Sequence, residues 1–185
     1  HSQGKVTLEE RMEPIDIPYE RNIAKTVMMP GNAIGRHLYV EKRMNDMAED
    51  GCKDPINRME IRDKSIGFIT SGIPYQYVRE ACPNASVLKL GMVHPLPKKL
   101  IEEFAAQVDK LYIFEELEPV IEEQVRSWGI EAVGKEIFTR QGEYSANMLR
   151  KAVLKQEVEI ADKAAVPARP PILCPGCPHR SVFTV

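Results

Sequence analysis

The sequence predicts an α/β fold with a mainly parallel sheet and helices on both faces of that sheet. Between residues 65 and 152, apolar runs of about five residues alternate with amphipathic stretches of about ten. This alternation is typical of right-handed βαβ units, in which a helix joins two parallel strands. The chain has 185 residues, of which 43% are hydrophobic, and this is enough for one packed domain. We therefore expect a single α/β domain with extended arms.

The composition argues against several other classes of protein. The net charge is −2, so there is no strongly basic field of the kind that binds nucleic acids. No apolar run is long enough to span a membrane, and the first residues (HSQGKVTLEE) lack the apolar stretch of a signal peptide. Four cysteines, with Cys52 and Cys82 isolated, do not indicate a disulfide framework. We expect a cytoplasmic protein with neither a nucleic acid nor a membrane as partner.

The first part of the chain is predicted to be an arm followed by a long helix. Residues 1–30 mix charges and prolines without a regular period, so we interpret them as an extended arm or a tag remnant. A helix is expected at residues 32–50, with Asn32 capping its start and Gly51 in the left-handed conformation beyond its end. The residues between 51 and 64 indicate a polar connection.

The alternating region gives the order of the remaining elements. Strands are expected at residues 65–70, 87–90 and 111–114, helices at 73–82, 100–108 and 119–128, a weaker strand at 132–138 and a last helix at 144–152. Pro119 stands at the favoured first position of its helix, and the apolar side chains of that helix are expected to point inward: Val120, Ile121, Val125 and Trp128. The regular order of strand, helix and strand predicts parallel neighbours.

Two groups of residues follow predicted strands and are candidates for a ligand edge or an interface. Glu115 and Glu116 follow the third strand, at the edge where open α/β sheets bind ligands. They could meet a cation or a partner domain, or form a solvated loop that favours the start of the next helix. Ser71 and Gly72 follow the first strand, where a phosphate-binding turn is one reading and an ordinary turn the other. Since no glycine-rich phosphate motif accompanies them, the ordinary turn is favoured.

The pair Cys174 and Cys177 is the sharpest chemical feature of the sequence. A C-x-x-C spacing lets two thiolates converge on one metal ion, one iron–sulfur cluster or one disulfide. The pair supplies half of a four-ligand site and follows a proline-rich run at residues 166–178, which is typical of a stiff linker. From the residues alone, a metal or redox role and a structural one remain open.

Several stretches resemble the transketolase C-terminal-like domain. They are residues 66–81 (IGFITSGIPYQYVREA), 87–97 (VLKLGMVHPLP) and 111–116 (LYIFEE). More narrowly, residues 30–37 (PGNAIGRH) and 170–180 (PPILCPGCPHR) resemble the large (alpha) subunit of indolepyruvate ferredoxin oxidoreductase. This resemblance covers nearly the whole chain, and CPGCPHR is its most specific part.

The resemblance implies an enzyme that oxidatively decarboxylates arylpyruvates such as indolepyruvate to acyl-CoA. Its implied cofactors are thiamine diphosphate, magnesium and 4Fe-4S clusters, which carry the chemistry. Its implied partners are the other domains of the same subunit, a smaller beta subunit, ferredoxin and coenzyme A. In related enzymes a similar Cys-x-Gly-Cys motif helps to hold a cluster, which implies a metal-ligand role for Cys174 and Cys177.

On this resemblance the chain divides into an arm at 1–30, a transketolase C-terminal-like domain at 31–165, and at 166–185 a linker with the start of a thiamine-diphosphate-binding domain. The sequence has no Gly-Asp-Gly motif and no cysteine-rich ferredoxin repeat. We therefore expect no catalytic residue and no bound cofactor in this piece, and predict an inactive structural or interface domain. Two alternatives remain: a stand-alone α/β module that binds a ligand at the Glu115 strand end, and a metal or redox C-x-x-C protein.

Overall fold

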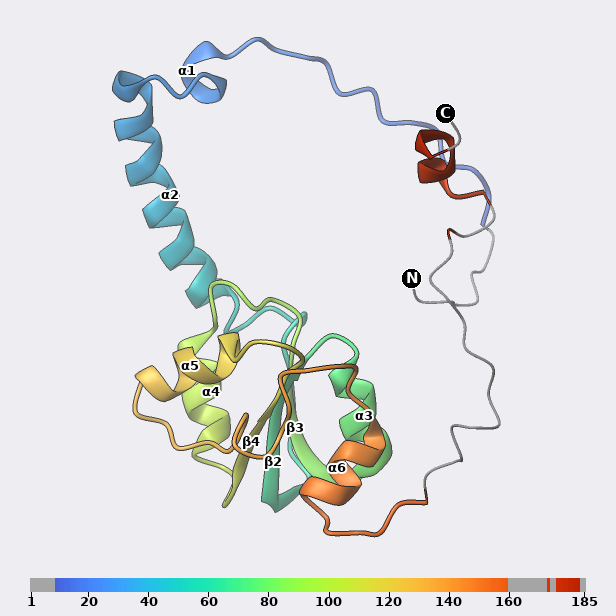
Figure 1. The fold of residues 1–185 in the computed structure, drawn as a ribbon. Coiled ribbons are helices and arrows are strands. Elements are labelled where there is room, and N and C mark those ends of the chain that lie inside the picture. The colour runs from blue at the N-terminus through green and yellow to red at the C-terminus, as the bar shows by residue number, and fades with distance from the viewer. Residues whose placement is uncertain (1–8, 160–172, 174–175, 184–185) are drawn as a thin grey trace.

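A four-stranded mixed sheet forms the centre of the α/β domain (Figure 1). The structure is a computed structural model that describes residues 9–159, 173 and 176–183. The strands are β1 (Arg58–Glu60), β2 (Asp63–Ser71), β3 (Ala85–Leu90) and β4 (Leu111–Phe114), in the spatial order β1-β3-β2-β4. β2 pairs in parallel with both β3 and β4, whereas β1 is antiparallel to β3. The three strands of the predicted alternation therefore form the parallel part of the sheet.

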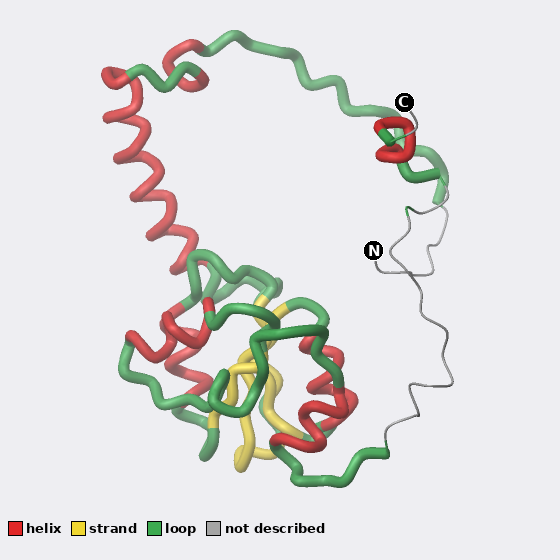
Figure 2. Tube along the Cα trace, in the orientation of Figure 1, coloured by secondary structure: helices red, strands yellow, loops and turns green. Residues whose placement is uncertain are grey.

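Helices cover both faces of this sheet (Figure 2). α3 (Pro74–Ala81) and α6 (Ala146–Ala152) pack together on one face. The other face is covered by α4 (Lys98–Ala105) and α5 (Val120–Ser127). The remaining helices are α1 (Ile23–Thr26), α2 (Pro30–Asp50) and the short 3-10 helix η2 (Pro178–Val182).

The alternation of side chains along each strand produces two apolar cores, one on each face. In β4, Tyr112 and Phe114 belong to the core under α3 and α6, whereas Leu111 and Ile113 belong to the core under α4 and α5. The first core is aromatic: the Phe114 ring lies 4.9 Å from that of Phe138 and 4.7 Å from that of Tyr144, between ring centroids. Each strand of the parallel part thus contributes to both cores.

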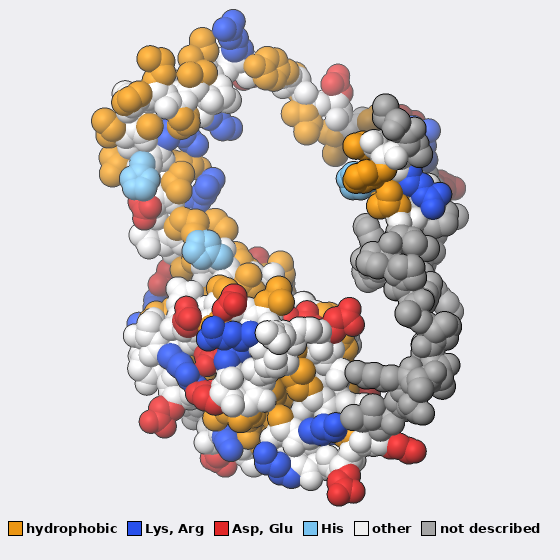
Figure 3. Space-filling view, viewed as in Figure 1, with side chains coloured by type: hydrophobic (Ala, Val, Ile, Leu, Met, Phe, Trp, Pro, Cys, Tyr) orange, Lys and Arg blue, Asp and Glu red, His pale blue; other side chains and the backbone are white. Residues whose placement is uncertain are grey.

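α2 projects away from the domain and carries no buried residue (Figure 2). Ile34 and Leu38 on this helix are each 69% exposed, and apolar side chains gather along its length (Figure 3). The described part of the arm before it, from residue 9 to residue 22, is exposed throughout and lies outside regular helix and strand. In the described residues, no helix combines the length and apolar character needed to cross a membrane.

The predicted fold class is confirmed, since the sheet is mainly parallel and has helices on both of its faces. The strand predicted at 111–114 has these bounds, and those predicted at 65–70 and 87–90 lie inside longer strands. The long helix is also confirmed, with its start at Pro30.

Several local predictions are wrong. Asn32 does not cap α2: Met29 occupies the N-cap, and the side chain of Asn32, which lies inside the helix, donates to the carbonyl of Val27 before it. Gly51 has the right-handed conformation, with φ −58°. Pro119 is the N-cap of α5 and not its first residue, and Val120 is 62% exposed.

The weaker strand predicted at 132–138 is reduced to one parallel bridge between Tyr112 and Val133. Conversely, the predicted polar connection at 51–64 contains β1, an edge strand of only three residues. The last helix begins at Ala146 and not at Tyr144, because the side chain of Ser145 caps it by accepting from the Met148 amide.

We predict that Phe114→Ala lowers the free energy of unfolding by about 3–5 kcal/mol, because it empties the centre of the aromatic core. Phe114 is fully buried. Urea denaturation followed by circular dichroism measures this change. Tyr19→Ala is the matched control, since Tyr19 is 88% exposed, and it should change the free energy by less than about 0.5 kcal/mol. Equal effects of the two substitutions would contradict the described core.

Candidate functional site

A hollow of about 480 Å³ lies at the carboxyl ends of β2 and β4, and the four residues predicted as a ligand or interface edge line it together: Ser71, Gly72, Glu115 and Glu116. After β2 the chain enters α3 on one face of the sheet, and after β4 it enters α5 on the other. In open α/β sheets, this reversal creates the crevice where ligands bind. The Thr70 hydroxyl donates to the Phe114 carbonyl over 2.8 Å and joins the two strand ends below the hollow.

The carboxylate of Glu115 holds the start of α5. Its Oε2 accepts from the Ile121 amide and its Oε1 from the Glu122 amide, both over 2.9 Å. These amides belong to the first turn of a helix, where backbone donors lack intrahelical partners and negative charge is favourable. Glu115 is buried, with 6% of its surface exposed. Both oxygens are thus occupied by structural hydrogen bonds. The geometry supports the interpretation in which this loop favours the start of the next helix.

Glu116 is also committed to a structural contact, because its Oε1 accepts from the Tyr144 amide over 2.9 Å. Next to it, Leu117 has the left-handed conformation, with φ 60°, and its side chain is 63% exposed. Such a conformation costs a non-glycine residue of order 1 kcal/mol. The loop therefore presents an apolar side chain to solvent at the mouth of the hollow.

A buried polar network lies at this edge of the sheet. The Lys135 ammonium donates to the Glu115 carbonyl and to the Tyr144 hydroxyl, and that hydroxyl donates to the Thr139 carbonyl over 2.7 Å. The Lys135 amide donates to Oε2 of Glu122, which is buried at 3% exposure. The network connects α5 with the segment that leads to α6.

Glu122 also fixes the residue next to Lys135. A Cβ at Gly134 would lie 2.1 Å from Oε2 of Glu122. This carboxylate cannot move aside freely, because it is buried and its other oxygen pairs with Arg126 at 3.0 Å. A side chain at position 134 would therefore displace the Glu122 carboxylate from its contacts.

Burial shifts the pKa values of the ionisable groups in the network. Desolvation raises the pKa of Glu115, although the amides of Ile121 and Glu122 and the charge of Lys135 act in the opposite direction. Desolvation also lowers the pKa of Lys135. The pKa of Tyr144 rises to about 12, first by desolvation and then by the nearby carboxylates of Glu115, Glu116 and Glu122.

The rim of the hollow is apolar. Ile73, Leu117 and Val120 line it and are each more than half exposed. Gly72 makes the sharp turn between β2 and α3, with φ 58°, a conformation that glycine adopts without strain. Since the carboxylates of Glu115 and Glu116 are occupied, the arrangement fits contact with another apolar surface better than acid–base chemistry.

The second predicted site lies mostly outside the described residues, because Cys174 is not among them. The Cys177 Sγ lies 3.6 Å from Nδ1 of His179, two residues further on. Cys52 donates to the Ala48 carbonyl, and Cys82 is buried in the aromatic core. In the part of the chain that the structure describes, no three histidine, cysteine or acidic residues form a group that could hold a metal. Within the described residues there is thus no complete ligand set for an iron–sulfur cluster or a metal-bound diphosphate, and the metal-ligand role of Cys174 and Cys177 stays a prediction.

Sequence reasoning missed Glu122, Lys135 and Tyr144. Glu122 stands in an amphipathic helix, where a glutamate is expected to face solvent. The one available signal was Gly134 next to Lys135, because an isolated glycine in a predicted strand indicates close approach of another group.

We predict that Glu115→Gln lowers the free energy of unfolding by about 1–2 kcal/mol, because one of the two α5 amides loses its acceptor and the negative charge at the helix start is lost. Urea denaturation at neutral pH gives the value. Glu118→Gln is the control: its side chain is 69% exposed and pairs with Arg140 at 3.5 Å, so a change below about 0.5 kcal/mol is expected. If Glu115→Gln lowered the free energy of unfolding no more than Glu118→Gln, the two hydrogen bonds to Glu115 would not stabilise the start of α5.

We predict that the Tyr144 phenol loses its proton near pH 12, against 10 for an ordinary tyrosine. A raised pKa means that the folded state binds this proton more tightly than the unfolded state. The free energy of unfolding should therefore fall as the pH rises from about 10 to about 12. The tyrosinate absorbance of the native protein minus that of Tyr144→Phe gives this titration. In denaturant the midpoint of this titration should move to about pH 10. An identical midpoint in the native and denatured states would contradict the described burial.

Comparison with known proteins identifies relatives along nearly the whole chain. Over 99% of its length, it is 33% identical to the indolepyruvate oxidoreductase subunit IorA of Pyrococcus horikoshii and 30% identical to that of Archaeoglobus fulgidus. The IorA subunit of Methanothermobacter thermautotrophicus is also 30% identical to it. The chain spans about a third of the length of these relatives. No protein-family model matches the sequence.

A solved structure supports the fold. The 2-oxoglutarate:ferredoxin oxidoreductase of Magnetococcus marinus, determined with 2-oxoglutarate, coenzyme A and succinyl-CoA bound, matches 69% of this chain and 24% of its own, with a TM-score of 0.53 and 18% identity. This likeness is consistent with the predicted transketolase C-terminal-like fold. The predicted resemblance is thus confirmed: the chain is related, over nearly its whole length, to about a third of the indolepyruvate oxidoreductase subunit IorA.

Proposed function

We propose that this chain is part of the large subunit of a 2-oxoacid:ferredoxin oxidoreductase that converts arylpyruvates such as indolepyruvate to acyl-CoA. The observation that carries the proposal is the match of 99% of the chain to IorA subunits at 30–33% identity. The motifs at residues 30–37 and 170–180 support the indolepyruvate type, because they are the segments that separate this family from other α/β domains.

Within that subunit, we propose that residues 31–165 are a structural and interface domain that makes no contact with the reacting atoms. The occupied carboxylates of Glu115 and Glu116 support this role. The apolar rim of the hollow and the exposed apolar side chains of α2 offer surfaces to the other domains of the subunit. The smaller beta subunit, ferredoxin and coenzyme A are the proposed partners of the whole cytoplasmic complex.

The proposed cofactors are thiamine diphosphate, magnesium and 4Fe-4S clusters, held by other parts of the subunit. Residues 166–185 are proposed to be the linker and the beginning of the thiamine-diphosphate-binding domain. Cys174 and Cys177 would contribute thiolates to a cluster that is completed by ligands outside this chain.

The test compares the 185-residue chain with the complete subunit, expressed from the natural gene together with its beta subunit. We expect the complete subunits to reduce ferredoxin with indolepyruvate, thiamine diphosphate, magnesium and coenzyme A under anaerobic conditions. The 185-residue chain should show no turnover in the same assay. Leaving out coenzyme A or the 2-oxo acid is the control for each preparation.

Two results would overturn parts of this proposal. Turnover by the 185-residue chain alone would show that its residues do the chemistry. The proposed substrate class would be wrong if a complete subunit that carries its cofactors did not reduce ferredoxin when any arylpyruvate was supplied. Sequencing the gene beyond codon 185 adds an independent check, since a Gly-Asp-Gly motif followed by cysteine-rich repeats is expected there.

A further inference from the structure

A second hollow, of about 500 Å³, lies beside the first at the carboxyl ends of β2 and β3. It shares Ser71 and Gly72 with the first hollow, but Arg58 and Lys89 line it in place of the glutamates. We propose that this hollow binds a phosphate group, either free or carried by a larger molecule. This inference does not depend on the proposed function.

The pairing of β1 with β3 brings the two cations together. Arg58 stands directly opposite Lys89 in the antiparallel register. Opposite residues of such a pair point to the same face of the sheet, and like charges at these positions destabilise it. Met59, the next residue, packs into the core under α4 and α5, so Arg58 and Lys89 lie on the α3 face. A bound anion would turn this repulsion into two attractive contacts.

Neither cation is fully neutralised within the described residues. The Lys89 ammonium makes no ion pair or hydrogen bond there, and the residue is partly buried. Arg58 has one ion pair, at 3.9 Å to Oε1 of Glu60, and donates to the Tyr75 hydroxyl over 3.3 Å. Both distances are at the long end for such contacts. Positive charge therefore remains available at the hollow.

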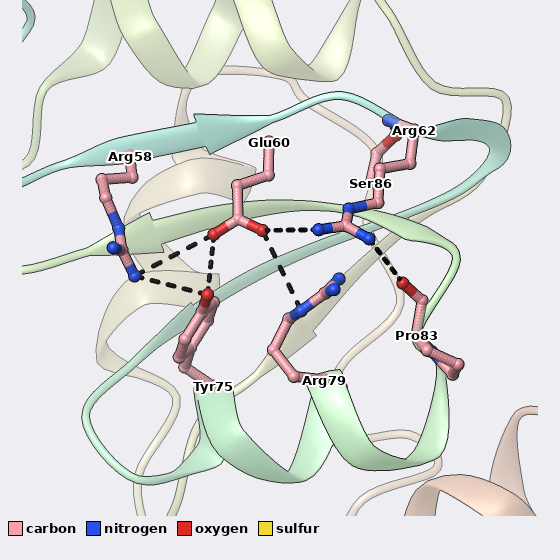
Figure 4. Close-up of polar contacts among 7 residues, drawn as sticks. All are labelled: Arg58, Glu60, Arg62, Tyr75, Arg79, Pro83 and Ser86. Atoms are coloured by element: carbon pink, nitrogen blue, oxygen red, sulfur yellow. Dashed lines mark hydrogen bonds and ion pairs between the residues drawn. The ribbon is translucent and has the colours of Figure 1, made fainter.

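Glu60 cannot balance the positive charge of Arg58 and Lys89, because three guanidinium groups share its carboxylate (Figure 4). Besides Arg58, it pairs with Arg62 at 3.7 Å and with Arg79 at 3.9 Å, and it accepts from the Tyr75 hydroxyl over 2.7 Å. Nη1 of Arg79 is buried and has no hydrogen-bond partner among the described residues. One carboxylate against three guanidinium groups leaves this side of α3 positively charged.

Neutral donors complete the hollow. Ser71 and Gln76 line it, and the Ser71 hydroxyl and the Gln76 side-chain amide make no hydrogen bond within the described part of the chain. The first turn of α3 adds the same sign of charge, since it has no side-chain cap and no acidic residue. The volume is in the usual range of small-molecule sites, about 300–1,000 Å³.

A phosphate group fits these donors better than a carboxylate. It carries up to two negative charges and presents acceptor oxygens in a tetrahedral arrangement, so cations from two strands and donors from the β2–α3 turn can reach it together. Arginine and lysine are the side chains that bind phosphate most often. The neighbouring hollow, in contrast, is bordered by Glu115, Glu116 and Glu118, which repel an anion.

The test is calorimetric titration of the 185-residue chain with inorganic phosphate and, separately, with ADP, at low ionic strength. Saturable binding is expected with at least one of them. Tighter binding of ADP would identify a phosphate carried by a larger molecule as the ligand, and equal binding would identify free phosphate. Amide resonances of Ser71 and Gln76 should shift on titration, which places the ligand at this hollow.

Lys89→Gln should weaken binding by at least about tenfold, as expected for the loss of one charged hydrogen bond. Lys89→Arg keeps the positive charge and should therefore bind about as tightly as the unchanged protein. Lys64→Gln is the matched control, because Lys64 is exposed at the opposite end of β2, and it should leave the dissociation constant unchanged. The single substitution keeps the Arg58 contacts, and circular dichroism confirms that the variant folds.

Three results would overturn the proposal. These are the absence of saturable binding of either ligand, an equal loss in Lys64→Gln and Lys89→Gln, and resonance shifts confined to residues remote from α3. An equal loss in the two variants would show that phosphate responds only to the overall charge of the protein.

Discussion

The buried carboxylates of Glu115 and Glu122 are the constraint on which the carboxyl edge of the sheet depends. Glu115 joins the end of β4 to the first turn of α5, and Glu122 joins α5 to the Gly134–Lys135 backbone. Lys135 then connects the Glu115 carbonyl to Tyr144, a member of the aromatic core on the other face. Through these contacts the two cores share one polar edge, and α5 cannot shift without leaving charged groups unpaired in the interior.

Much of the central fold could be predicted because its signals are local. β2, β3 and β4 are apolar runs bounded by polar turns, and their order with the helices implies parallel pairing. β1 could not be predicted: Arg58, Met59 and Glu60 form a short, mostly charged segment that becomes a strand only by pairing with β3. Asn32 and Gly51 have the residue types of helix caps, yet Pro30 had already begun the helix, and the backbone at Gly51 stays right-handed.

The candidate site was predictable in position but not in its chemistry. The rule that strand ends meet at one edge was sufficient to bring Ser71, Gly72, Glu115 and Glu116 together. Whether a carboxylate there is free depends on which amides reach it, and this is decided by the path of the chain from Leu117 to Ile121. Lys135 comes from a segment whose predicted strand did not form, and Tyr144 lies just before the observed start of the last helix, so no periodicity could have placed them beside Glu115.

The β2–α3 turn separates two hollows of opposite electrostatic character. On the β4 side, carboxylates and exposed apolar side chains surround the hollow, whereas on the β3 side Arg58 and Lys89 surround it. An anionic group that approaches this edge is repelled by the carboxylates of the first hollow and attracted by the cations of the second. An apolar partner surface could therefore cover the β4 side while the β3 side stays free for a phosphate group. The single edge of the sheet can serve both contacts because Ser71 and Gly72 belong to both hollows and carry no charge of their own.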